Sequence, residues 1–248
     1  MIRKLFVVLA SGLAMTAILS AQTVDEVVAK IIDAQGGKEV FMSIDTSLSK
    51  GKMIFQGGAA SGELRIYQKR PNLVRFELDV AGTTLIQAHD GEDAWKVVPA
   101  VMQGTGKPEA MTERERRDFL GGAHIDPLLI DYQEKGHEVE LVGTEDMEGT
   151  EVYHLKVTHN NGRVFEQYYD TETGLLIKNI TMTYNPQLGQ DLEMTQYMGD
   201  YKDVGGMMIA HSVEAQVMGQ TAFQIVFEEF VANPDLDDSM FSRPAEEE

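Results

Sequence analysis

The sequence predicts a mainly β protein: a half-open, curved antiparallel β-barrel of about eleven strands, with short helices that cover or plug its concave face. Apolar and polar residues alternate through most of Glu63–Pro99, as strands with one buried and one wet face require. Turn pairs such as Ala81-Gly82 and Asp90-Gly91 separate the runs at hairpin spacing. Helical spacing is confined to the start and the middle of the chain.

Residues 1–21 have the pattern of a cleaved export signal. Arg3 and Lys4 precede an apolar run, Leu5–Leu19, and Ser20-Ala21 offers a cleavage site. A membrane anchor is the alternative, but the run is short for a span of about 20 residues. We therefore expect an exported protein that is soluble after signal cleavage.

The cysteine content and the net charge exclude several classes of modification and partner. The chain has no cysteine, so it has neither disulfides nor the cysteine that a bacterial lipoprotein carries after its signal. The net charge is −19, and removal of Arg3 and Lys4 leaves 19 basic residues against 40 acidic ones, which is −21. This charge argues against nucleic acid and against an anionic membrane surface as partners.

The first element after the signal is a helix. Thr23 and Glu26 have the spacing of a capping box, valines and isoleucines follow at helical intervals, and Gly36-Gly37 ends the run. A second short helical piece includes Val40 and Phe41. A strand then covers Ser47–Gln56, and the four strands of Glu63–Pro99 follow.

The middle of the chain, Val101–Lys135, interrupts the strands. Thr112 and Glu115 form another capping box, which predicts a short charged helix ending at Gly121-Gly122. Asp126-Pro127 has the character of an N-cap followed by a first-turn proline, which predicts a second short helix. The glycines make this segment a plausible mobile insert.

Seven further strand segments follow Gly136, with tight turns at Asn161-Gly162 and Thr173-Gly174. No Pro- or Ser-rich linker and no internal repeat is present, so we expect residues 22–248 to form a single domain. The expected segments are Glu138–Val142, Val152–Thr158, Val164–Asp170, Leu175–Tyr184, Leu192–Tyr201, Met207–Met218 and Ala222–Val231.

No catalytic or metal pattern stands out. The sequence has no His-Glu-x-x-His, no cysteine ligand and no Gly-x-Ser-x-Gly elbow, so we expect a protein that is not an enzyme and uses no metal or cofactor. Methionines in the expected strands fit either ordinary core packing or a soft cavity lining. The lone Trp95 beside a turn fits either packing or a cavity mouth.

Several short motifs resemble one family. The run Gly62–Leu73 contains Lys-Arg-Pro-Asn-Leu, and Asp90-Gly91-x-x-x-Trp-x-x-x-Pro follows it. Together they resemble the periplasmic lipoprotein carrier family (LolA/LolB-like). Asp126-Pro127-Leu128, Tyr169–Leu175 and Asp203–Gly206 resemble later parts of the outer-membrane lipoprotein-sorting group.

The resemblance implies a periplasmic carrier that holds lipid or lipoprotein acyl chains in an apolar barrel cavity under a helical lid, in transfer toward the outer membrane. It implies an inner-membrane transporter and an outer-membrane acceptor as partners, a monomer, and Arg70 as the residue that holds the lid shut. A turn with a solvated arginine is the alternative for Arg70. The expected cavity residues are Phe55, Leu64, Ile66, Val74, Phe76, Leu78 and Trp95. The alternative function is an envelope-stress sensor or interaction module on the same fold.

Overall fold

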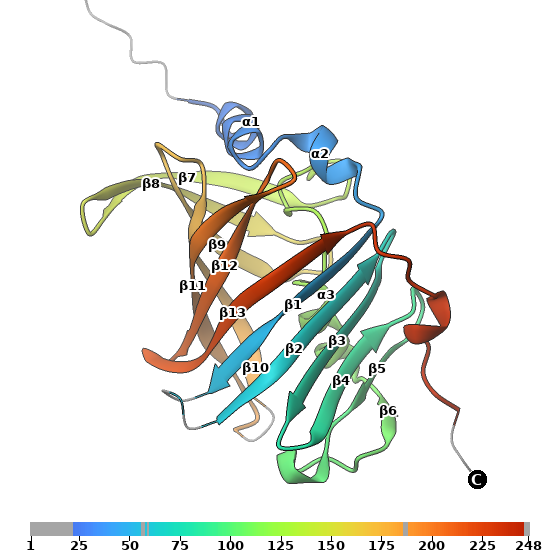
Figure 1. Ribbon diagram of the computed structural model, residues 1–248. Coiled ribbons are helices and arrows are strands. Elements are labelled where there is room, and N and C mark those ends of the chain that lie inside the picture. The colour runs from blue at the N-terminus through green and yellow to red at the C-terminus, as the bar shows by residue number, and fades with distance from the viewer. Residues whose placement is uncertain (1–21, 56–57, 59, 186–187, 246–248) are drawn as a thin grey trace, which may run out of the picture.

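The computed structural model describes residues 22–55, 58, 60–185 and 188–245. Its described residues form one antiparallel sheet of thirteen strands, which curves strongly and is not closed into a barrel (Figure 1). The strands are β1 Thr46–Phe55, β2 Ala60–Lys69, β3 Leu73–Val80, β4 Thr83–His89, β5 Ala94–Val97, β6 Pro108–Ala110, β7 Glu138–Met147, β8 Thr150–Thr158, β9 Val164–Asp170, β10 Leu176–Asn185, β11 Gln190–Val204, β12 Met207–Val217 and β13 Gln220–Ala232.

The order of the strands places the first and last strands at the centre of the sheet. β1 pairs with β2 on one side and with β13 on the other, and the order runs β6-β5-β4-β3-β2-β1-β13-β12-β11-β10-β9-β8-β7. The edge strands β6 and β7 therefore come from the middle of the chain. This confirms the predicted mainly β, half-open curved sheet, although the short strand β6 lies in the segment expected to be an insert.

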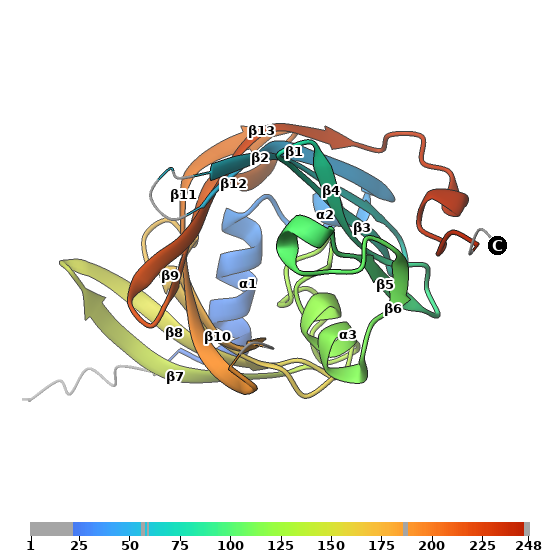
Figure 2. The ribbon, with the colours of Figure 1, turned by 90° about the horizontal axis from the view of Figure 1, so that it is seen from below.

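Helix α1, Val24–Ala34, begins where the sequence predicts. The Thr23 side chain accepts from the Glu26 N–H, and the Glu26 carboxylate accepts from the Thr23 N–H, which completes the capping box. Figure 2 shows α1 inside the curve of the sheet. Its apolar stripe forms the largest core cluster of the described residues, with members from α1, residues 129–132, β8 and β9: Val27, Val28, Ile31, Leu129, Tyr132, Tyr153, Leu155, Val157, Phe165 and Tyr169.

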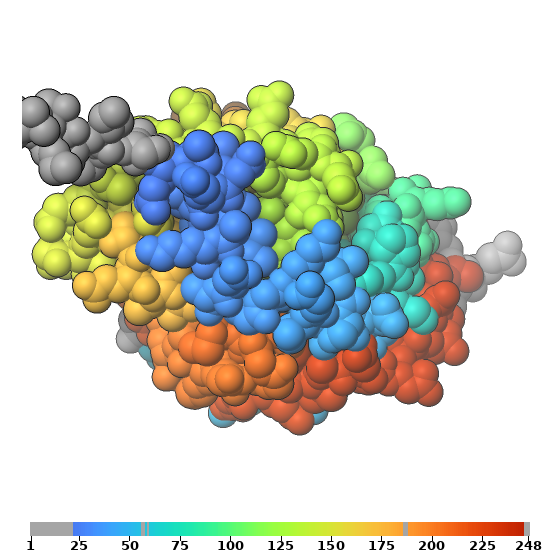
Figure 3. Space-filling view, turned by 90° about the horizontal axis from the view of Figure 1, so that it is seen from above, coloured from blue at the N-terminus to red at the C-terminus, as the bar shows by residue number. Residues whose placement is uncertain are grey.

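Helix α2, Lys38–Met42, confirms the second short helical piece. Its Phe41 packs with Ile44, Ile130 and Met207 in a second cluster. Figure 3 shows α1 and α2 lying side by side over one end of the molecule, next to residues from the middle of the chain. These two helices and that middle segment together cover this end of the sheet.

The capping box at Thr112 also opens a helix as predicted: α3, Glu113–Leu120, whose cap makes both reciprocal hydrogen bonds. The prediction of a second mid-chain helix after Asp126-Pro127 is wrong. Residues 128–136 form turns, because Asp131 has a left-handed φ of 51° and Asp126 directs its carboxylate at Arg70 and Lys135. A short 3₁₀ turn, η2 (Ala100–Met102), precedes β6.

The expected signal, residues 1–21, and Gln56 at the expected end of the first strand lie outside the described residues. Within the part of the chain that the structure describes, no helix is long and apolar enough to cross a membrane.

Candidate functional site

The concave face of β1–β3 carries six of the seven expected cavity residues. Cross-strand pairing joins Ile66 to Phe76 and Leu64 to Leu78, so the alternation read from the sequence places these side chains on one face. Leu64 and Leu78 are buried in a third core cluster with Met53, and Phe55, Ile66 and Phe76 are only partly buried beside them. The last of the six, Val74, is buried on the same face.

Two cavities open on this concave side. The first, which we call the α1-side cavity, has a volume of about 350 Å³ and lies between residues 124–128, the ends of α1 and α2, and strands β9–β13. The second, the α3-side cavity, has about 590 Å³ and lies between α3 and strands β1–β3 and β9–β11. Ile66, Val74 and Phe76 line the α3-side cavity. Ser49 of β1 lines both cavities, so they adjoin across this strand.

Some methionines line the cavities, whereas others lie in the core, as Met53 does, or at the surface. Met198, Met207 and Met208 line the α1-side cavity, and Met194 lines the α3-side cavity. Met218, in contrast, is exposed at the tip of the β12–β13 hairpin. Four flexible side chains in the lining give the concave walls shapes that adapt to an apolar ligand.

Trp95 is the expected cavity residue that the structure places elsewhere. It pairs across β4 and β3 with Ala88 and Arg75, which lie on the face opposite to Phe76. Its indole N–H donates to the Phe241 carbonyl at 2.7 Å, and the Arg75 guanidinium lies over its ring. The C-terminal segment runs beside β5 (Figure 2), and Trp95 is fully buried. Its interpretation as a cavity mouth is therefore wrong, and the packing alternative describes its surroundings.

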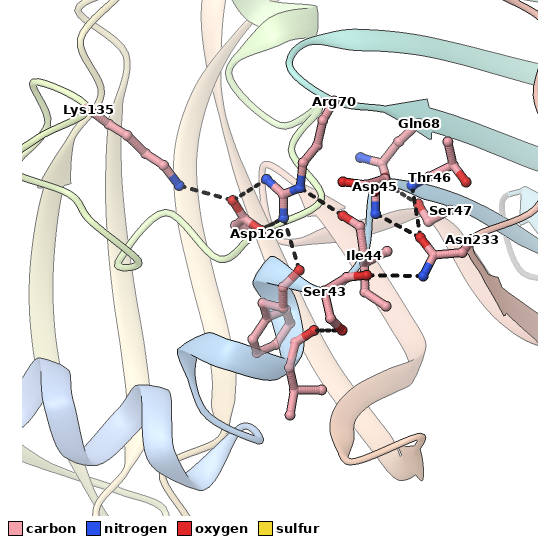
Figure 4. Close-up of polar contacts among 12 residues, drawn as sticks. Ser43, Ile44, Asp45, Thr46, Ser47, Gln68, Arg70, Asp126, Lys135 and Asn233 are labelled. Carbon is pink, nitrogen blue, oxygen red and sulfur yellow. Dashed lines mark hydrogen bonds and ion pairs between the residues drawn. The ribbon is translucent and has the colours of Figure 1, made fainter.

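Arg70, at the end of β2, joins three segments that are distant in sequence (Figure 4). Its Nε donates to the Ile44 carbonyl at 2.7 Å and its Nη2 donates to the Phe41 carbonyl at 3.0 Å. Its Nη1 and Nη2 both donate to the carboxylate of Asp126, the first at 2.9 Å. We call this group of contacts the Arg70 latch, and residues 121–135 the lid segment.

The latch is partly enclosed, and its one carboxylate faces two cations. Burial by itself raises the pKa of Asp126, but the hydrogen bond from Arg70 and the charge of Lys135 outweigh burial and hold this pKa below its ordinary value. The Asp126 side chain is 5 % exposed, so it remains a buried carboxylate paired with two cations. A carboxylate in this setting binds a guanidinium with bidentate, charge-assisted hydrogen bonds.

Asn233 fixes the chain next to the latch. Its Oδ1 accepts from the backbone N–H of Asp45 at 2.7 Å, and its Nδ2 donates to the Ser43 carbonyl at 3.0 Å (Figure 4). These bonds tie the residues between α2 and β1 to the end of β13. The two carbonyls that Arg70 binds are therefore held on a fixed support.

Three histidines gather beside the lid segment. His124 and His159 approach at 3.0 Å between their Nε2 atoms, and His137 stacks on His159. Backbone N–H groups of Asn161 and Asn160 donate to Nδ1 of His159 and His137, which places the proton of each neutral ring on Nε2. This tautomer leaves His159 without a free Nε2 lone pair for a metal. No group of metal-binding side chains is found among the described residues.

The sequence predicted that the expected cavity residues of β1–β3 share one face, and three of them, Ile66, Val74 and Phe76, line the α3-side cavity, whereas Leu64 and Leu78 pack in a core cluster. For Arg70 the sequence indicated a partner within Val101–Lys135 but not which residue, nor the carbonyls of Phe41 and Ile44. Phe41 and Ile44 contribute backbone carbonyls, which no side-chain pattern can indicate. Asp126 was visible only as an expected helix cap. Lys135 lies only nine residues after Asp126. This closeness was the one sequence signal that could have indicated that the Asp126 carboxylate binds a cation.

Comparisons with known proteins agree on the fold. No protein-family model and no curated protein matches the sequence. Among solved structures, a LolA superfamily protein from Nitrosomonas europaea is similar with a TM-score of 0.59 and 12% identity, covering 86% of this chain and 96% of that one. A domain described as an outer membrane lipoprotein-sorting protein, from Vibrio parahaemolyticus, has a TM-score of 0.57 and 14% identity, covering 87% and 94%. A DUF1329 family protein from Desulfovibrio piger has a TM-score of 0.57 and 13% identity, covering 88% and 95%.

Proposed function

From the fold that this chain shares with LolA superfamily and lipoprotein-sorting proteins, we propose that it binds the acyl chains of a lipid or lipoprotein in its concave cavities. The observation that carries the proposal is the partly buried apolar face of Phe55, Ile66 and Phe76, which adjoins the α3-side cavity. A protein core normally buries such side chains completely. Here a ligand would complete their burial.

The energetics favour an acyl ligand. Each buried methylene contributes about 0.8 kcal/mol before the entropic costs of binding. A chain that buries about ten methylenes therefore gains roughly 8 kcal/mol. Such a ligand needs no catalytic group in the cavity, which is consistent with a binding protein that is not an enzyme.

The Arg70 latch gives the cavity a gate. It holds Asp126 of the lid segment, which runs between the two cavities, to the end of α2. A few hydrogen bonds that involve charged groups contribute about 1.5–3 kcal/mol each. The four latch bonds together amount to about 6–12 kcal/mol, similar in size to the gain from acyl-chain burial, so the two states are close in free energy: cargo can open the lid, and its departure lets the latch close again.

The cellular setting follows from the same proposal. A protein of this kind acts in the periplasm after cleavage of residues 1–21, takes cargo from an inner-membrane transporter and passes it to an outer-membrane acceptor. The alternative, an envelope-stress sensor or interaction module, uses the same fold without carrying cargo. N-terminal sequencing of the native protein tests the export step, since an intact Met1 would contradict it.

Two measurements test acyl binding. Native mass spectrometry of protein purified from its own cells should show bound lipid. In the purified protein, Phe76→Asp should weaken the uptake of a fluorescent fatty acid, because it places a charge in the apolar wall. Val226→Asp is the matched control, since Val226 is 42% exposed on β13 and lines neither cavity.

Unchanged uptake in a folded Phe76→Asp variant would remove this face from the binding site. Absence of lipid from the native protein, together with absence of fatty-acid uptake, would favour the interaction module.

The gate has its own test. Arg70→Leu should leave the sheet folded and increase hydrogen exchange across the lid segment. Arg70→Lys is the matched variant: it keeps the charge but lacks the planar fork that reaches two carbonyls and a carboxylate, so exchange should also increase, to a smaller extent. Equal exchange in Arg70→Leu and the wild type would mean that the latch does not hold the lid.

A further inference from the structure

In the wall of the α3-side cavity, Arg163 carries a charge that no carboxylate of the described chain pairs with. Its Nε donates to the Thr181 hydroxyl at 3.2 Å, and its Nη1 donates to the backbone carbonyl of Asp118. Both acceptors are neutral. No described Asp or Glu oxygen lies within the 4.0 Å of an ion pair.

This isolation distinguishes Arg163 from the other arginines near the sheet and α3. Each of six others contacts a carboxylate within that distance: Arg65, Arg70, Arg75, Arg114, Arg116 and Arg117. The whole chain has 40 acidic residues and 21 basic ones, so carboxylates are plentiful. An arginine in a cavity wall without one is the exception.

The surroundings hold the Arg163 side chain in place. Gly121, just after α3, leaves room for it, because a Cβ there would lie 2.7 Å from the Arg163 Cδ. The guanidinium also lies over the Phe165 ring, with its centre 5.2 Å from the ring centroid. Burial lowers the pKa of Arg163, and the charge of Asp118, which is beyond ion-pair distance, partly opposes this; a guanidinium with an ordinary pKa above about 12 remains charged. The cation is therefore fixed at the cavity and incompletely solvated.

Capping the end of α3 explains only part of this arrangement. The bond to the Asp118 carbonyl is a helix C-terminal contact, favourable for a cation. It uses one of the five N–H groups of the guanidinium, and Thr181 accepts from a second. Nη2 makes no hydrogen bond to any residue that the structure describes. Its donors suit the paired oxygens of a carboxylate or phosphate.

The rest of this cavity mixes apolar side chains with a few polar ones, such as Ser49, Gln68 and Gln87. Two carboxylates of α3 also line it, and each already has a cation: Glu115 pairs with Lys96 and Asp118 pairs with Arg117. Ile66, Val74 and Phe76 line it from the sheet, and Phe119 lines it from α3. A ligand that satisfies both Arg163 and these apolar side chains has an anionic head and a long apolar chain. The volume of about 590 Å³ lies within the range of small-molecule sites.

We propose that the α3-side cavity selects anionic single-chain amphiphiles, of which a long-chain fatty acid is the simplest, with the head group on Arg163 and the chain along β2 and β3. This inference rests on the proposed acyl binding and adds the chemistry of the head group. It predicts that removing the negative charge from the ligand weakens binding, although the chain is unchanged.

The test compares dodecanoic acid, methyl dodecanoate and dodecyl phosphate as competitors of a neutral fluorescent probe, N-phenyl-1-naphthylamine. The wild type should bind dodecanoic acid about tenfold more tightly than its methyl ester, a difference of about 1.4 kcal/mol. Arg163→Gln should bring the two affinities together while ester binding persists. Arg117→Gln is the matched control, since Arg117 lies on α3 next to Asp118 and does not line the cavity. Circular dichroism checks that each variant is folded.

The salt dependence of wild-type binding tests the same point without any variant, because screening should reduce the preference for the acid as salt rises. Tighter binding of dodecyl phosphate than of dodecanoic acid would identify phosphate as the preferred head, and the reverse would identify carboxylate. Equal wild-type affinities for acid and ester, or a preference that survives Arg163→Gln, would overturn the inference while leaving acyl binding intact. Failure of all three ligands to displace the probe would overturn the proposed function as well.

Discussion

Two parts of one concave face differ in what covers them. Under α1, strand β8 contributes Leu155 and Val157 to a cluster in which each is fully buried. Under α3, strands β2 and β3 contribute Ile66 and Phe76, which stay partly exposed beside a cavity. The sheet curves around both helices (Figure 2), so curvature alone does not decide where the interior fills.

The two helices account for the difference. Both begin with a complete capping box, so both start equally well. α1 then buries Val27, Val28 and Ile31, whereas α3 has the sequence Glu-Arg-Glu-Arg-Arg-Asp-Phe-Leu and buries no residue. A charged helix laid across an apolar sheet cannot fill it. The cavity therefore exists because α3 lacks the apolar stripe with which α1 fills the space above its part of the sheet.

The largest expected change in the free energy of unfolding comes from the core cluster under α1. Leu155→Ala should lower the free energy of unfolding by about 2–5 kcal/mol, because it leaves a void that the neighbouring side chains cannot fill. Denaturant unfolding measures this. A loss below about 1 kcal/mol would mean that the region under α1 is as loosely packed as the region under α3.

An intermediate loss of stability is expected when the pH falls and His137 takes up a proton. Burial, with the nearby charges of His159, His124 and Lys135, lowers the pKa of His137 from 6.5 to about 4. Burial also lowers the pKa of His159, with a smaller contribution from the charge of Arg163. The unfolded chain therefore takes up protons first as the pH falls. The stability that neutral His137 contributes is present above pH 6.5 and lost between pH 6.5 and about 4, to a limit of about 3 kcal/mol.

Unfolding free energies measured across this window check the prediction, with His137→Gln as the comparison. Gln can still accept from the Asn160 N–H but does not titrate, so the pH dependence should become shallower. Parallel profiles for the two proteins would show that His137 does not limit acid stability.

The smallest expected change in the free energy of unfolding comes from the cavity wall under α3. Phe76→Ala should lower the free energy of unfolding by less than about 1.5 kcal/mol, since the side chain is only partly buried and already borders a cavity. The same denaturant measurement applies. A loss equal to that of Leu155→Ala would break the comparison, because it would mean that Phe76 belongs to a filled core.

Local patterns predicted much of this molecule. Alternation along β2 and β3 predicted which side chains share a face, since period two places Ile66 and Phe76 on one side regardless of the rest of the fold. Capping boxes located α1 and α3. These signals lie within a few residues of the features that they predict.

The failures involve distant partners. The Asp126-Pro127 pair has the local chemistry of a helix start, but Arg70 and Lys135 take the carboxylate that would cap it. Trp95 was expected at a cavity, but it is buried and bonds to Phe241, 146 residues later in the chain. The unpaired state of Arg163 also depends on which carboxylates the fold brings near, so sequence spacing alone could not show it.

The pairing of β1 with β13 constrains how the chain folds. Ser47 lies opposite Ala232, so the centre of the sheet forms only when the first and last strands meet. Closing so long a loop is entropically unfavourable, and contacts of high sequence separation form slowly. The wall that joins the two cavities across β1 is therefore incomplete until the C-terminal strand has been synthesised and has paired with β1. A chain truncated before Gln220 would expose one edge of β1 and leave an apolar surface open to aggregation.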